Sequence, residues 1–143
     1  MGKFTIISDR DDMIMKAINR YVWPRFPARN EALKRACYYK TVGHRRRIFY
    51  RCELCGREGL TRDEIAVDHI IPRVLTSGYD DLLSWIERTL CDASGLQVIC
   101  VEPCHHEKTA KEAAERSEHR KANKAKKARK KVDKKVRKKG KRK

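Results

Sequence analysis

The fold of this chain is decided by three motifs: Cys52-Glu-Leu-Cys55, Val67-Asp68-His69-Ile70-Ile71-Pro72, and Leu96-Gln-Val-Ile-Cys100-Val-Glu-Pro-Cys104-His105-His106-Glu107-Lys108-Thr109. A close pair of cysteines supplies two thiolates from one tight turn, and two such pairs complete a tetrahedral zinc site. The motifs therefore predict a structural zinc ion with four ligands, namely Cys52, Cys55, Cys100 and Cys104.

A zinc staple of this kind leaves three metal-binding or proton-accepting side chains unexplained. Asp68 and His69 lie between the cysteine pairs, and His105 directly follows Cys104. Adjacent residues on a strand point to opposite sides, so Asp68 and His69 are suited to different roles. The economical interpretation is a second site beside the zinc, made of a carboxylate and two imidazoles.

Taken together, the motifs resemble the HNH family of nucleases, whose pattern reads Cys-x-x-Cys, Asp-His-Ile-x-Pro and Asn-Leu-Gln-x-Leu-Cys-x-x-Cys-His-x-x-Lys-Thr. The resemblance covers roughly residues 50–112. It implies an α+β fold with a ββα-metal core stapled by zinc, and metal-dependent hydrolysis of DNA phosphodiester bonds. It also implies a phage-type protein that acts in homing or genome packaging, with DNA and phage packaging proteins as partners.

The resemblance also implies the roles of the site residues. His69 would activate water, because a neutral imidazole has a suitable proton affinity near pH 7. Asp68 and His105 would hold one divalent ion, with His106 as the rival ligand to His105. An oxygen and nitrogen ligand set suits Mg²⁺ or Mn²⁺, with Ni²⁺, Co²⁺ and Zn²⁺ as further candidates. Arg73 and Lys108 would contact phosphate.

Two positions depart from the family pattern. Gly95 stands where the family has an Asn whose amide braces the loop that holds the base, so either catalysis is slowed or Ser94 or Asp92 substitutes. Three residues, not two, separate Cys100 from Cys104, which predicts a wider turn. Gly95 also favours an alternative function, a zinc-stabilised nucleic-acid-binding protein with a decayed nuclease site. A second alternative is an RNA-binding zinc ribbon.

The charge is concentrated at the C-terminal end of the chain. The 143 residues carry a net charge of +17, and residues 120–143 hold 16 Lys or Arg against one Asp. Such a run binds polyanions by releasing counterions, without sequence selectivity. The predicted nucleic-acid contacts in this tail include Lys126, Lys127, Arg129, Lys130 and Lys131.

Hydrophobic periodicity predicts the remaining elements. Amphipathic helices are expected over 9–22, capped by Ser8 or Asp9, and over 28–39. Strands are expected over 65–71 and 96–99, a helical segment over 79–90, and a helix from His105 into the tail. The predicted regions are an N-terminal helical region (1–48), an HNH nuclease domain (49–115) and a Lys/Arg-rich tail (116–143).

Composition narrows the cellular setting. No run approaches the ~20 apolar residues that span a bilayer, and the first residues do not resemble a signal peptide. The six cysteines are therefore expected to be reduced, with four bound to metal, in a cytoplasm, which would be that of the host cell for a phage protein. A monomer or weak dimer is expected, and a monomer with one site would nick one strand per event.

Overall fold

The computed structural model of the chain describes residues 7–140, and the side chains of residues 7–130. It confirms the predicted α+β class, with helices and two separate two-stranded antiparallel sheets. The elements in chain order are α1 (Asp9–Ala17), α2 (Pro27–Ala36), β1 (Cys37–Val42), β2 (Arg45–Tyr50), β3 (Ile65–His69), α3 (Leu82–Thr89), β4 (Leu96–Cys100) and α4 (His106–Gly140).

The first helical segment begins where the sequence predicts. The Ser8 hydroxyl accepts the backbone N–H of Asp11 at 3.1 Å, which caps α1 and leaves acidic residues in the first turn. Beyond Ala17 the helix continues through a wider turn, Ile18–Val22, and a tighter one, Trp23–Arg25. Pro24 lies at the start of the tighter turn and Pro27 begins α2, because each ring fixes φ and removes a donor.

The predicted helix over 28–39 is wrong at its C-terminal end. α2 stops at Ala36, and the following residues form β1, which pairs with β2 from Cys37 opposite Tyr50 to Val42 opposite Arg45. Aromatic and β-branched residues fill β1, and Gly43 takes a φ of +63° in the turn. The strand propensity and this glycine outweigh the helical spacing of the preceding residues.

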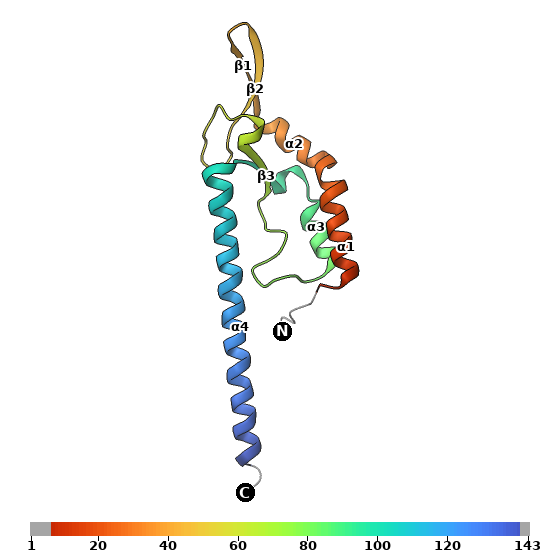
Figure 1. The fold of residues 1–143 in the computed structure, drawn as a ribbon, viewed down its shortest axis with the longest axis vertical. Coiled ribbons are helices and arrows are strands. Elements are labelled where there is room, and N and C mark those ends of the chain that lie inside the picture. Colours follow the sequence, from red (N-terminus) through yellow and green to blue (C-terminus); the bar gives the residue numbers. More distant parts are fainter. Residues whose placement is uncertain (1–6, 141–143) are drawn as a thin grey trace.

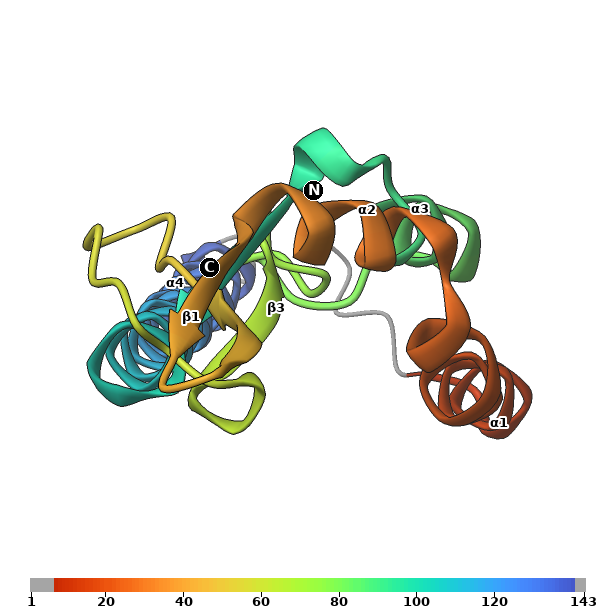
Figure 2. The ribbon, with the colours of Figure 1, turned by 90° about the horizontal axis from the view of Figure 1, so that it is seen from above.

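The second sheet forms the centre of the molecule. β3 pairs with β4 so that Val67 lies opposite Val98 and Asp68 opposite Gln97. The small buried residues of α2 pack against β4, and Figure 2 shows α2 crossing above the strands. α4 follows directly after β4 and one helical turn, which gives the ββα order. The predicted strands and the helical segment over 79–90 are present with slightly different ends.

Two elements extend away from this centre. In Figure 1 the β1–β2 hairpin projects at one end of the molecule, and α4 runs far beyond the body in the opposite direction. Among the residues described, none of the helices combines the length and the apolar character that a membrane span requires.

Candidate metal centre and active site

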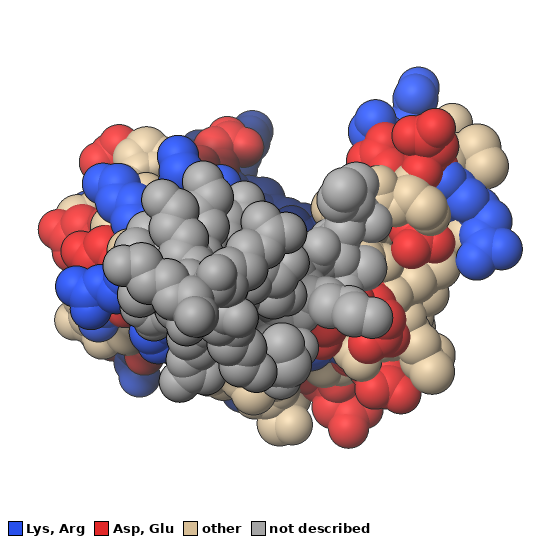
Figure 3. All heavy atoms as spheres, turned by 90° about the horizontal axis from the view of Figure 1, so that it is seen from below, with Lys and Arg blue, Asp and Glu red and all other residues tan. Residues whose placement is uncertain are grey.

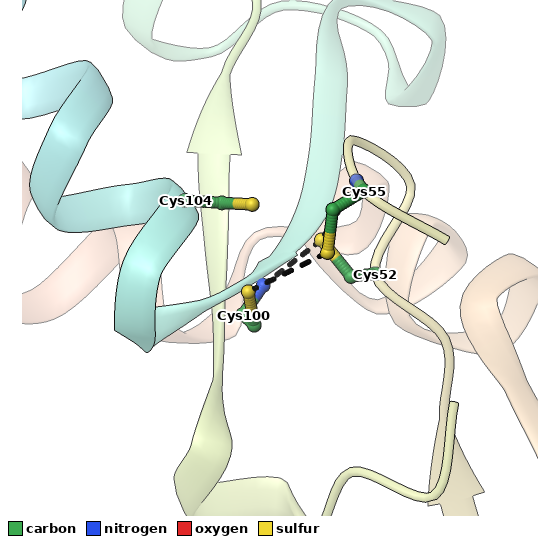
Figure 4. A group of neighbouring side chains, drawn as sticks. All are labelled: Cys52, Cys55, Cys100 and Cys104. Atoms are coloured by element: carbon green, nitrogen blue, oxygen red, sulfur yellow. Dashed lines mark hydrogen bonds between the residues drawn. The ribbon is translucent and has the colours of Figure 1, made fainter. Parts of the chain in front are cut away.

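The four cysteines of the predicted staple converge on one point. Their sulfur atoms all lie within 4.8 Å of one another, and Figure 4 shows them arriving from the loop after β2, the end of β4 and the turn before α4. The Sγ atoms of Cys55 and Cys100 are 3.9 Å apart. Two sulfurs that bind one tetrahedral zinc at ~2.3 Å would be ~3.8 Å apart, so the group fits this ion.

The backbone around Cys52 favours its thiolate. The N–H groups of Cys55 and Cys100 donate to the Cys52 sulfur at 3.4 and 3.3 Å. Burial raises the pKa of the Cys52 thiol, but these backbone donors outweigh it and lower the pKa to about 6. Gly56, at a φ of +76°, closes the turn. The longer spacer forms the helical turn Val101–His105, which still brings Cys104 to the group.

A cleft of about 500 Å³ lies between α1, β3, α3 and the start of α4. Figure 3 shows a hollow between the part of the molecule that carries α1, on the right, and the remainder. Asp68, His69, Arg73 and His105 all line this cleft. Residues far apart in sequence therefore face one space, beside the zinc group.

His69 is buried and held from two sides. Its Nε2 atom lies 2.9 Å from the backbone carbonyl oxygen of Thr89 at the end of α3, and its ring stacks on Trp23 at 4.7 Å between centroids. A carbonyl only accepts, so Nε2 carries the proton and Nδ1 of the neutral ring is the basic nitrogen. Burial lowers the pKa of His69, and nearby Arg73 and Lys108 add to this effect. The imidazole is therefore neutral at pH 7.

Asp68 lines the same cleft as His69, its neighbour on β3, but its side chain has different partners. Its carboxylate accepts from the Gln97 amide at 3.3 Å and pairs with the Lys108 ammonium at 2.7 Å. Lys108 also donates to the backbone carbonyl of His69 at 2.8 Å and to Glu112 at 2.6 Å. The predicted phosphate contact is thus a bridge that ties α4 to the Asp-His pair.

The two consecutive histidines have different surroundings. His105 lines the cleft with Asp68, whereas the Nδ1 atom of His106 lies 2.6 Å from the carboxylate of Glu102, on the exposed surface. A carboxylate and an imidazole in one cleft leave coordination positions for water and phosphate, as a catalytic metal site needs. Asp68 and His105 thus have the chemistry and the shared cleft for one hard divalent ion.

The structure adds residues that the motifs do not identify. Glu112 and Arg116 line the cleft at helical spacings beyond Lys108, and Asn19 in the wider turn after α1 accepts a hydrogen bond from Arg73 at 2.6 Å. The i, i+4 spacing from Lys108 to Glu112 and Arg116 is a signal that sequence reasoning could have used. The described side chains of the predicted tail contacts, Lys126, Lys127, Arg129 and Lys130, are exposed on α4, and that of Lys131 lies outside the described residues.

Gly95 contacts the loop after His69 through its backbone. Its carbonyl accepts the N–H of Ile70 at 3.0 Å. Within the described part of the chain, no hydrogen bond joins the side chain of Ser94 or Asp92 to this loop. A Cβ atom at Gly95 would lie 2.8 Å from the sulfur of Cys91, so this position has no room for a side chain.

An Arg–Glu pair braces the same region from outside. Arg35 of α2 donates to both carboxylate oxygens of Glu53, at 2.6 and 3.0 Å. The same guanidinium also donates to the carbonyls of Ala93 and Leu96 at 2.9 and 2.8 Å. The first cysteine turn is thereby fixed to the segment that leads into β4.

A comparison with known protein families matches residues 52–91 to the HNH endonuclease model. Residues 52–91 are therefore similar to HNH endonucleases. The matched stretch contains the first cysteine pair, the Asp-His pair of β3 and the whole of α3, while the second cysteine pair and His105 follow it in the ββα unit. No curated protein and no solved structure matches the chain. This similarity indicates a nuclease that acts on nucleic acid with a divalent metal.

Proposed function

We propose that this HNH domain hydrolyses DNA phosphodiester bonds as a metal-dependent endonuclease, with His69 as the general base. The observation that carries the proposal is the anchoring of His69. Because the Thr89 carbonyl holds Nε2–H, the unprotonated Nδ1 is fixed in orientation, and burial keeps it neutral near pH 7. A base of this kind takes a proton from the attacking water.

The proposed ligands of the catalytic ion are Asp68 and His105, which line the cleft with His69. When bound, Mg²⁺, Mn²⁺ or a similar divalent ion would supply positive charge to the scissile phosphate and the leaving oxygen. Lys108 pairs with the Asp68 carboxylate and ties it to the backbone of β3. Arg73 adds a guanidinium in the cleft wall for a phosphate oxygen. Structural zinc at the four cysteines would hold the start of α4 against β4.

The proposed biological role and domain division are supported by the family resemblance and by the positive charge of the tail. The proposal includes a phage-type protein acting on DNA in homing or genome packaging, as a monomer or weak dimer in the host cytoplasm. It also keeps the division into residues 1–48, 49–115 and 116–143, with the tail as a nucleic-acid contact. A decayed, purely binding site is the second candidate function, because Gly95 replaces the bracing Asn.

Nicking of supercoiled plasmid with Mg²⁺, Mn²⁺ or Ni²⁺ tests the proposal, with wild type, His69→Ala and His106→Ala compared at matched zinc content. Loss of a general base should slow nicking by about 10²–10⁴-fold while DNA binding persists. The His106→Ala control should remain active, because His106 lies outside the cleft. Nicking by His69→Ala at the wild-type rate would refute the assigned base. Tight binding with no cleavage in any metal would establish the decayed site.

A further inference from the structure

Most of the β1–β2 hairpin lies outside the hydrophobic core of the molecule. It projects beyond the end of the body, and most of its residues are exposed on both strands (Figure 1). Only its base is anchored: Tyr50 pairs with Leu60, and the Tyr38 hydroxyl accepts the N–H of Gly59 at 2.7 Å. A lone two-stranded hairpin is at best marginally stable, so anchoring at one end leaves the rest available to a partner.

The hairpin is strongly and exclusively basic. Residues 32–52 contain seven Lys or Arg and no Asp or Glu. Four of these cations lie on the projecting strands: Lys40, Arg45, Arg46 and Arg47. None of the four has an ion-pair partner within the part of the chain that the structure describes, whereas Arg35 and Arg51 at the base do. The exposed charge therefore lacks a counter-charge from the protein itself.

The register sorts these cations onto faces. Lys40 lies opposite Arg47, and Val42 opposite Arg45, so three cations share one face of the ribbon. On the other face, Arg46 stacks over the ring of Tyr39 at 4.1 Å, and that ring is 55% exposed. One face thus presents a row of unpaired cations, and the other a guanidinium held flat on an aromatic ring.

We propose that the β1–β2 hairpin is a second DNA-binding element, which inserts into the major groove of duplex DNA with Lys40, Arg45 and Arg47 facing phosphates and base edges. The proposal rests on the proposed DNA cleavage for its choice of polyanion. A two-stranded ribbon fits the ~12 Å width of the major groove. Six-residue strands at ~3.3 Å per residue reach ~20 Å, enough to enter the groove while the base stays on the body.

The test measures binding to a 20-bp fluorescent duplex by anisotropy, in a zinc-loaded His69→Ala background without added Mg²⁺. The hairpin variant carries Lys40→Gln, Arg45→Gln and Arg47→Gln. The control carries Arg10→Gln, Lys16→Gln and Arg20→Gln, which remove the same charge from α1 and the wider turn after it, on another side of the molecule. We expect the hairpin variant to bind at least about tenfold more weakly, with the slope of log K against log[salt] reduced by about 2–3. The control should change less than about threefold.

A second variant separates charge from folding. Arg45→Lys with Arg47→Lys retains the cations and should retain most of the affinity, and circular dichroism with zinc content verifies that each variant is folded. Methylation of guanine N7, a major-groove atom, should be blocked by the parent protein and not by the hairpin variant. Absence of that protection would refute groove insertion.

Other outcomes overturn the proposal in distinct ways. In the first, the hairpin variant and the control lose equal affinity for the duplex. In the second, the protein binds single-stranded RNA of the same length more tightly than the duplex. In the third, the protein forms a dimer that only the hairpin variant fails to form. Plasmid nicking is scored separately with an active His69. If the protein with an active His69 nicks plasmid and the hairpin variant binds DNA as tightly as its parent, this inference alone is refuted. If the hairpin variant loses DNA binding but the protein with an active His69 does not nick plasmid, the proposed function alone is refuted.

Discussion

At the scale of single residues, Gly95 shows how the site is braced without the family's Asn. The Gly95 carbonyl takes the N–H of Ile70, and the Thr89 carbonyl takes the Nε2–H of His69. Two backbone acceptors therefore hold His69 and the loop that follows it. Cys91 fills the space that a side chain at Gly95 would need. The side chains at positions 95 and 91 are therefore complementary in size.

Restoring the Asn should therefore harm the protein. Gly95→Asn is expected to destabilise the fold by about 1–3 kcal/mol, because the new Cβ overlaps the Cys91 sulfur. The double variant with Cys91→Ala should be at least about 1 kcal/mol more stable to unfolding than the sum of the two single effects predicts. Urea unfolding of zinc-loaded wild type, both single variants and the double variant gives this coupling. Strictly additive free energies of unfolding would contradict the steric explanation.

At this scale the motifs identify the reactive residues but not the contacts that orient them. Asp68, His69 and His105 are visible as residue types at family spacings, and they line one cleft. The contacts that orient them are invisible in the sequence. A backbone carbonyl such as that of Thr89 has no residue signature, and the stacking of Trp23 on His69 joins segments that only the tertiary fold brings together.

At the scale of elements, α3 fixes the long segment that joins β3 to α3. Arg88 donates through Nε to the carbonyl of Arg73 at 3.0 Å, and its two terminal nitrogens bind the carboxylate of Asp80 at 2.9 and 2.6 Å. One guanidinium therefore fixes both ends of the segment that follows the base. This bidentate pair also keeps Arg73 in the cleft wall.

This pair predicts a pH dependence of stability. The Arg88 hydrogen bonds lower the pKa of Asp80, so its contribution is present above the unfolded pKa of about 3.9 and is lost as pH falls through the lower folded pKa. Asp80→Asn should cost about 1 kcal/mol at pH 7. The difference from wild type should hold to about pH 5 and shrink below pH 4.

Urea unfolding of both proteins at each pH measures this difference, since acid effects on the zinc site are common to both. Glu87→Gln on the same helix is the control. A difference between wild type and Asp80→Asn that stays constant down to pH 3.5 would contradict the assignment.

Periodicity predicted most elements but failed where two propensities compete. α1, β3, α3 and β4 follow from apolar spacing and from caps such as Ser8. The segment after Ala36 continues a helical pattern while carrying aromatic and β-branched residues, and its pairing with β2 decides the outcome. Gly43 between two β-prone runs was the signal for a hairpin.

At the scale of the whole molecule, positive charge lies on two elements that project in opposite directions, the hairpin and α4 (Figure 1). The described tail side chains are exposed on a helix with little apolar surface, so their contribution is electrostatic. The body between them holds the cleft. The proposed DNA binding and the proposed cleavage would therefore depend on separate parts of the structure.

Removing residues 120–143 should weaken DNA binding by more than about tenfold near 150 mM salt and flatten its salt dependence, because the deleted run carries 16 Lys or Arg. Metal-dependent nicking at low salt should persist, since the cleft residues remain. Filter binding and plasmid nicking across a salt series measure both. A tail of scrambled sequence but equal composition should restore binding. Loss of nicking at every salt concentration would show that the tail supports the cleft itself.

The position of His105 immediately before α4 has a geometric consequence. α4 spans 35 residues, or about 52 Å at 1.5 Å per residue, the length of roughly 15 base pairs. His105, a proposed ligand of the catalytic ion, thus stands at one end of a rod whose other end is densely cationic. With the rod lying along the duplex, the footprint would be lopsided, with the nick near one border and protection reaching one and a half helical turns to the other side. The length of α4 would then set the distance between the nick and the far border of the protected DNA.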